Sequence, residues 1–155
     1  MIYIIRHVES EFNKTRIKKR NCGITEDGKL NAHELKGHYD IVLQSPLKRC
    51  EETLKYSNIT YGKKIIVDSL REHKIDECDF FENEENIIES ETDILHRVNE
   101  FKNYLTELIK GNHDKSILII GHSDQIWYLT SKIVDGERYG VWLKNGEMFE
   151  YDLDS

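Results

Sequence analysis

Two short apolar runs that both end at a histidine constrain this fold more than any other feature of the sequence. Residues 2–5 are apolar and lead into Arg6 and His7, and residues 116–120 lead through Gly121 into His122. Apolar runs of this length are typical of buried strands. Polar side chains at the end of a buried strand are costly unless they have a function there. We therefore expect these two strand ends to meet.

The rest of the chain alternates between expected strands and helices. Strands are expected at residues 2–6, 41–43, 64–68 and 116–120, and residues 141–143 and 148–151 are expected to form a terminal hairpin or strand pair. Helices are expected from Thr25 to about Tyr39, from Ser45 to about Asn58 with Pro46 as the first helical residue, from Ser90 to Gly111, and from about Gln125 to Val134. This order predicts an α/β fold, a three-layer α/β/α arrangement with a mostly parallel central sheet. With no internal repeat or linker, residues 1–155 are predicted to form a single domain.

Composition narrows the function classes. The chain has 155 residues, 38% of them hydrophobic, and a formal net charge of −7. This charge makes a general role on nucleic acid or a membrane surface improbable. The three cysteines form no C-x-x-C pair, and no segment resembles a secretory signal or a bilayer span. We expect a cytoplasmic protein, and the sequence leaves its oligomeric state open.

Two charged segments flank the expected helices. Residues 9–21 are basic and are either a solvated segment or a positive rim over an anion site. Residues 73–90 are acidic and are interpreted as an exposed, solubilising loop. Trp142 and Tyr151 are both expected to pack in the core.

The strand ends offer the groups that phosphoryl transfer needs. His7 can act as the nucleophile if it is neutral, since its ordinary pKa of about 6.5 would be lowered by neighbouring arginines. Arg6 and Arg49 can hold the phosphate oxygens in bidentate geometry. His122 can donate a hydrogen bond to a phosphoryl oxygen, and Asn13 is a plausible further donor.

Six segments of the chain, in order, resemble the motifs of the histidine phosphatase superfamily, which includes the cofactor-dependent phosphoglycerate mutases and acid phosphatases. They are Arg6-His7-Val8-Glu9-Ser10 with Asn13, Thr25-Glu26-Asp27-Gly28 with Ala32, residues 45–53, Leu70-Arg71-Glu72, Glu89-Ser90 with Arg97-Val98, and Gly121-His122. Any one of these matches alone is weak, but together they cover much of the chain.

The resemblance implies a phosphoglycerate mutase-like fold and a covalent mechanism. His7 would carry the phosphoryl group as a phosphohistidine, and Glu72 would protonate the leaving group and then assist water. Neither a metal nor another cofactor is implied. Two departures stand out, because Val8 replaces the family's glycine after the nucleophile and Asp124 adds an anion near an anion site. A β-branched residue at position 8 restricts the backbone and is expected to crowd the pocket.

Three functions stay open at this point. A phosphatase acting on a small phosphate monoester is favoured, because Leu70-Arg71-Glu72 supplies the acid that an ester leaving group needs. A protein phosphohistidine phosphatase, with a phosphoprotein substrate, or a cofactor-dependent phosphoglycerate mutase is the first alternative. A non-catalytic phosphate-binding module weakened by Val8 is the second.

Overall fold

A five-stranded sheet forms the centre of the protein. The computed structural model describes residues 1–154, and its main sheet has the order β3-β2-β4-β1-β7. The strands of this sheet are β1 (Ile2–Arg6), β2 (Lys36–Gln44), β3 (Asn58–Ile66), β4 (Ile117–Gly121) and β7 (Met148–Tyr151). All neighbouring pairs are parallel except β1 and β7. The mostly parallel sheet predicted from the alternating pattern is confirmed.

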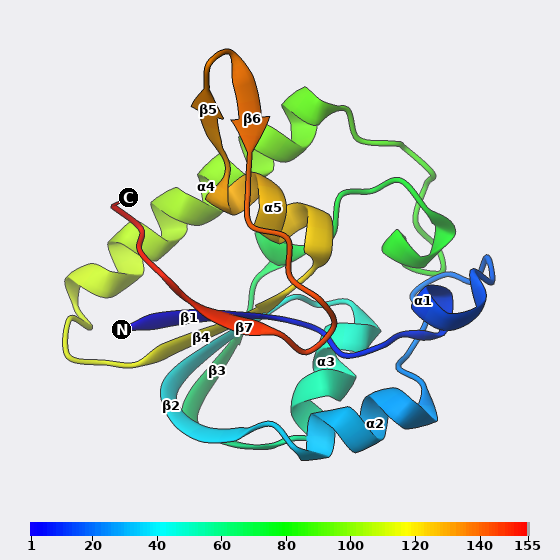
Figure 1. The fold of residues 1–155 in the computed structure, drawn as a ribbon, viewed down its shortest axis with the longest axis horizontal. Helices are drawn as coiled ribbons and strands as arrows, with labels where there is room; N and C mark the ends of the chain where they lie inside the picture. The colour runs from blue at the N-terminus through cyan, green and yellow to red at the C-terminus, as the bar shows by residue number, and fades with distance from the viewer. Residues whose placement is uncertain (155) are drawn as a thin grey trace.

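Helices cover both faces of this sheet. They are α1 (Glu11–Thr15), α2 (Glu26–His33), α3 (Lys48–Lys55), α4 (Glu91–Lys110) and α5 (Ser123–Thr130). In Figure 1, α4 and α5 lie on one side of the sheet and α2 and α3 on the other, while α1 lies beyond the carboxyl end of β1. The three-layer architecture follows from this arrangement.

Neighbouring residues of the central strands face opposite layers, because side chains alternate along a strand. Ile4 and Ile119 pack with Phe101 of α4 in one cluster. Ile5 and Ile120 pack in a second cluster. Both faces of β1 and β4 are therefore buried, which explains their continuous apolar sequences.

The two strand ends that carry the histidines meet as expected. Arg6 is in register with Gly121, and the amide of His7 donates to the carbonyl of Gly121 at 3.1 Å. The end of β2 joins them, since the amide of Ser45 donates to the carbonyl of Ile120 at 3.1 Å. Three consecutive carboxyl ends thus form one edge, where parallel sheets commonly bind ligands.

Two expected boundaries in the first half of the chain are wrong. The helix from Thr25 ends at His33 rather than Tyr39, and Lys36 already belongs to β2. Gly37 has φ of 127°, which a right-handed helix does not accommodate. Along its length β2 pairs with β3, which begins at Asn58 and ends at Ile66 rather than spanning 64–68.

The helix expected to start at Ser45-Pro46 begins two residues later. Leu47 is extended and caps α3, and its amide donates to Ser45 Oγ at 3.3 Å. Pro46 therefore precedes the helix instead of opening it, and α3 ends at Lys55 rather than near Asn58.

The expected terminal hairpin is also wrong. The helix α5 ends at Thr130, and the hairpin lies upstream, between β5 (Lys132–Val134) and β6 (Glu137–Tyr139). Residues 141–146 form no strand, and β7 pairs with β1. Tyr151 is buried as expected, but Trp142 is 58% exposed.

The helix expected after Ser90 is confirmed. Ser90 and Asp93 form the capping box, and Gly111 caps the other end of α4. No helix within residues 1–154 is both long and apolar enough to cross a membrane.

Candidate active site

A cavity of about 250 Å³ lies at the carboxyl edge of the sheet. Five of the six residues predicted for the site line it: Arg6, His7, Asn13, Arg49 and Glu72. The sixth, His122, is fully buried beside them, with its ring centroid 5.2 Å from that of His7. The structure therefore brings all six residues together.

The hydrogen bond of His7 fixes which of its nitrogens can react. Nδ1 lies 2.6 Å from the carbonyl oxygen of Val8, which can only accept, so Nδ1 carries the proton. In the neutral ring Nε2 then keeps its lone pair. Burial, followed by the charge of Arg49, lowers the pKa of His7 well below its ordinary value. The imidazole is thus held neutral and nucleophilic at Nε2.

His122 is held by the segment that follows β2. Its Nε2 lies 2.8 Å from Ser45 Oγ and 3.4 Å from Cys50 Sγ. Its Nδ1 is buried and has no hydrogen-bond partner among residues 1–154. A buried, unpaired ring nitrogen next to His7 is suited to bonding a phosphoryl oxygen.

The two arginines are oriented by backbone carbonyls. Arg6 Nη1 donates to the carbonyl of Leu143 at 3.0 Å, and its Nε is buried with no partner. Arg49 Nη1 donates to the carbonyl of Cys78 at 2.7 Å, and its Nη2 donates to Asp79 Oδ1 at 2.8 Å. Each guanidinium has five N–H donors, so both retain donors for an anion.

Asn13 is oriented through its amide oxygen. Oδ1 accepts from the amide and hydroxyl of Ser10 and from Asn145 Nδ2. The amide nitrogen is the group that Asn13 can offer to an anion. Asn145 also donates to the carbonyl of His7 at 3.1 Å, so the 144–146 turn supports the nucleophile, a contact that sequence reasoning missed.

The basic segment 9–21 contributes fewer positive charges to the edge of the cavity than a positive rim would require. Among its cationic residues only Arg16, at φ of 58°, lines the cavity. Arg20 instead reaches the acidic segment, where it donates to the carbonyls of Phe81 and Glu84 at 2.8 and 2.6 Å.

The interpretation of residues 73–90 as an exposed loop is correct only in part, because residues 82–83 and 85–88 are exposed but residues 78–80 are buried. Asp79 is 3% exposed and pairs with Arg49, and Glu84 pairs with Arg71 at 2.5 Å. These ion pairs fold the segment over the cavity. Sequence reasoning missed them because the partners are distant along the chain.

Glu72 is held by four donors, three of them at the start of α5. Its Oε1 accepts from the amides of His73 and Gln125, both at 2.9 Å. Its Oε2 accepts from the Ser123 hydroxyl and the Asp124 amide, both at 3.2 Å. The side chain is therefore fixed in one orientation next to His7 in the cavity.

Opposing effects set the pKa of Glu72. Burial raises it most, and the nearby carboxylates of Asp124 and Asp79 raise it further. The charge of Arg49 and the hydrogen bond from the His73 amide lower it. The resulting pKa is about 7, which suits an acid and base that works near neutrality.

Arg97 supports the backbone that carries Glu72. It donates to the carbonyls of Ser69, Arg71 and Glu72, the last at 2.9 Å, and pairs with Glu89. Leu70 anchors the same segment in the core. The pairing of Glu89 with Arg97 thus positions the backbone segment that carries Glu72.

Val8 does not crowd the pocket, contrary to the expectation. Its side chain packs with Ile24 and Ala32 in a separate cluster and does not line the cavity. Its amide donates to Thr53 Oγ1 at 3.1 Å. Because side chains alternate about an extended backbone, the valine and His7 point in different directions.

The substitution Val8→Gly is expected to lower the free energy of unfolding by about 2–4 kcal/mol, through lost packing and added chain entropy. No gain in kcat is expected. Urea unfolding and phosphatase assays check this, with Val8→Ala as the control that removes the methyl groups alone. A large rise in kcat with unchanged stability would contradict the packing role.

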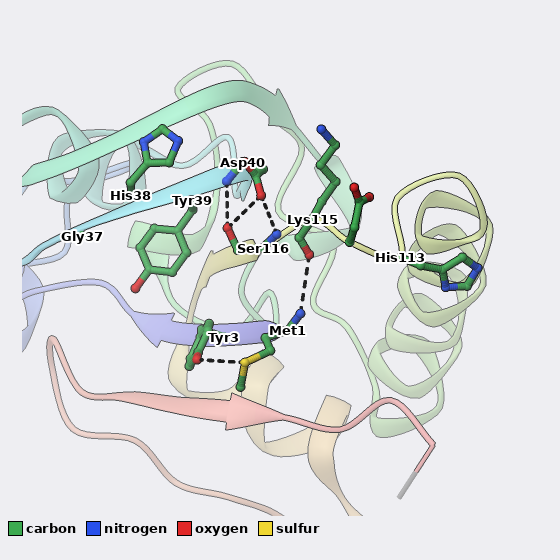
Figure 2. A pocket seen from close by; sticks show the side chains of 10 residues that line it. Met1, Tyr3, Gly37, His38, Tyr39, Asp40, His113, Lys115 and Ser116 are labelled. Atoms are coloured by element: carbon green, nitrogen blue, oxygen red, sulfur yellow. Dashed lines mark hydrogen bonds between the residues drawn. The ribbon is translucent and has the colours of Figure 1, made fainter.

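A larger cavity, of about 590 Å³, lies at the opposite end of β1 and β4 (Figure 2). Met1, Tyr3, Asp40 and Ser116 are among its lining residues, and the Ser116 amide donates to Asp40 Oδ2 at 2.8 Å. None of the six predicted site residues lines it. The chemistry is therefore concentrated at the carboxyl edge.

Comparisons with known proteins identify the family of this chain. The model of the histidine phosphatase superfamily (branch 1) matches residues 2–86, which is more than half of the chain. No curated protein matches the chain.

Several solved structures share the fold at low sequence identity. A putative alpha-ribazole-5'-P phosphatase from Escherichia coli matches with a TM-score of 0.60 and 20% identity, covering 83% of this chain and 76% of its own. The protein histidine phosphatase SixA, complexed with tungstate, matches with a TM-score of 0.58 and 19% identity, covering 95% and 84%. The ecdysone phosphate phosphatase from Bombix mori, also with tungstate, matches with a TM-score of 0.63 and 13% identity, covering 95% and 86%.

The fold, the order of the motifs and the match of the family model agree, and this chain belongs to branch 1 of the histidine phosphatase superfamily.

Proposed function

We propose that this protein is a phosphatase that hydrolyses a phosphate monoester through a phosphohistidine on His7. The observation that carries the proposal is Glu72, a buried carboxyl group with a pKa of about 7 that lines the same cavity as His7. An alkoxide leaving group needs a proton, and this group can supply it.

The reaction has two steps. In the first, Nε2 of His7 attacks phosphorus, the bond to the ester oxygen breaks, and Glu72 gives its proton to that oxygen. In the second, the Glu72 carboxylate takes a proton from water, whose oxygen attacks the phosphohistidine and releases phosphate. Arg6, Arg49 and His122 hold the phosphoryl oxygens while their charge shifts.

A protein phosphohistidine phosphatase is the second candidate. It is supported by the structural match to SixA along most of both chains. The phosphoramidate leaving group of such a substrate needs less acid catalysis, so the well-held Glu72 favours an ester. The binding module that Val8 would weaken has less support, because Val8 packs away from the cavity.

Substrate comparison tests the proposal. We expect kcat/KM for an aryl phosphate to exceed that for a phosphohistidine protein, with no isomerisation of 3-phosphoglycerate. A higher kcat/KM for the phosphoprotein would support the second candidate, and isomerisation would reveal a mutase. The cytoplasmic location and single domain stay predictions, and so does the absence of nucleic-acid and membrane partners.

The pH dependence follows from the two titrating groups. Glu72 must be protonated for the first step, so kcat/KM is expected to fall as pH rises above about 7. His7 must be neutral, and its lowered pKa places the acidic limb below its ordinary value. At each pH, kcat/KM of the wild type is divided by kcat/KM of Glu72→Gln. Ionisation of the substrate affects both proteins equally and therefore cancels in this ratio. A ratio that stays constant from neutral to alkaline pH would contradict the assignment of Glu72.

A further inference from the structure

The cavity that holds His7 carries two opposite charges. Its positive side is formed by Arg6 and Arg49, and Arg16 adds a third guanidinium to the lining. Asp76 and Asp124 also line it, and neither makes an ion pair with a lysine or arginine within 4.0 Å among residues 1–154. A phosphate group without a cationic substituent would be attracted by the arginines and repelled by the two aspartates.

The charge of Arg6 acts on Asp124 from a distance, but among residues 1–154 no lysine or arginine pairs with Asp124 within 4.0 Å. Its Oδ2 lies 4.0 Å from Nδ1 of His73. His73 Nε2 lies 2.9 Å from the carbonyl of Glu89 and donates to it, so in the neutral ring Nδ1 is a lone pair. Burial, and then the charge of Asp79, raise the pKa of Asp124.

Asp76 acts on the same region. Its charge contributes to the raised pKa of Asp124, after the effects of burial and Asp79, so the two carboxylates repel each other. Asp79 differs from both, since Arg49 already neutralises it at 2.8 Å. A cation placed near Asp76 and Asp124 would relieve this repulsion.

The walls and size of the cavity restrict what can carry that cation. Phe12 and Trp142 line the cavity, and the guanidinium of Arg6 lies 5.8 Å from the centroid of the Trp142 ring. Aromatic faces favour cations as well as apolar groups. The volume of about 250 Å³ accepts a phosphoryl group with a short tail.

We propose that the substrate is a small phosphate monoester whose alcohol carries an ammonium group, with the phosphate at Arg6 and Arg49 and the ammonium at Asp76 and Asp124. This inference rests on the proposed phosphatase function and names its substrate class. Asp124 thereby gains a role in specificity, at a position where the sequence departs from the family pattern.

Two esters of equal length test the inference. The two esters are compared at about pH 8, where a primary ammonium group is charged. We expect kcat/KM for 2-aminoethyl phosphate to exceed that for 2-hydroxyethyl phosphate by about two- to fivefold, the range of a partly exposed ion pair. In the double variant Asp76→Asn and Asp124→Asn this ratio should fall towards one. The ratio is the readout because loss of the Asp124 charge also affects Glu72, and therefore both esters alike.

A matched control keeps the ratio interpretable. Glu82→Gln with Glu85→Gln makes the same change in net charge on exposed residues of the same segment and should keep the wild-type ratio. Equal kcat/KM values for the two esters in the wild type would overturn the inference, as would a ratio that survives in the Asp76 and Asp124 variant.

Binding of uncleavable analogues separates this inference from the phosphatase function. We expect 2-aminoethylphosphonate to bind the wild type about two- to fivefold more tightly than 2-hydroxyethylphosphonate in calorimetry. Tighter binding of the amino analogue, without turnover of either ester, would support the assignment of Asp76 and Asp124 to the ammonium group. The same result would overturn the phosphatase function. Turnover of both esters without any preference in binding would overturn the charge assignment alone.

Discussion

Replacing His7 with alanine is expected to lower kcat for phosphate monoesters by at least about a thousandfold. The expected loss is this large because Nε2 of His7 is the atom that forms the bond to phosphorus. The protein should still fold, since the buried ring makes a single hydrogen bond, to the carbonyl of Val8. Steady-state assays with an aryl phosphate measure the loss, and thermal unfolding checks the fold.

His96→Ala is the matched control. This histidine lies on α4 with 78% of its side chain exposed, and it pairs only with Glu100 among the described residues. Its removal should leave kcat unchanged. Activity that persists in a folded His7→Ala variant would exclude a covalent role for this residue.

Replacing Glu72 with glutamine is expected to lower kcat for an alkyl phosphate by about 10²–10⁴-fold, the usual range for general acid catalysis. A good aryl leaving group needs less protonation, so its loss should be smaller. The dependence of rate on the pKa of the leaving group should therefore become steeper in the variant. Rapid-quench measurements with a series of esters would show this change in slope.

The amide of glutamine also disturbs local hydrogen bonding, because the four donors around Glu72 all face an acceptor. Unfolding midpoints are needed beside the kinetics, with Glu82→Gln as the control on an exposed carboxylate. Equal losses for alkyl and aryl esters would assign Glu72 a structural role instead of proton transfer.

The strands β1 and β4 and the longest helix, α4, could be predicted because their signals are local. The continuous apolar residues of β1 and β4 reflect burial on both faces. The capping box at Ser90 and the periodic apolar residues of α4 reflect one buried face. The meeting of Arg6 and His122 then followed from the rule that parallel strands share a carboxyl edge.

The hairpin of β5 and β6 was missed although its signal is in the sequence. Asp135 and Gly136 both have positive φ, at 52° and 81°, as a two-residue hairpin turn requires. An Asp-Gly pair between short β-branched segments is a strong hairpin signal. The apolar residues 133–134 were instead taken as the end of α5.

The site itself was only partly accessible from the sequence. The ion pairs of Arg49 with Asp79 and of Arg71 with Glu84 join residues that are distant along the chain, so an acidic segment was taken for a solvated loop. Glu72 was identified through the family resemblance alone, because one carboxylate in an acidic stretch has no distinguishing local pattern. The residues that Val8 packs against, Ile24 and Ala32, lie well along the chain, so no local rule predicts this contact.

Trapping the phosphoenzyme tests the central claim most directly. The protein is mixed with an aryl phosphate, quenched in alkali within one turnover, and analysed by mass spectrometry of its peptides. We predict one added phosphoryl group on the peptide that contains His7, stable in alkali, lost in acid and absent from His7→Ala. Turnover without any phosphorylated peptide, or a phosphoryl group on another residue, would contradict a covalent mechanism through His7.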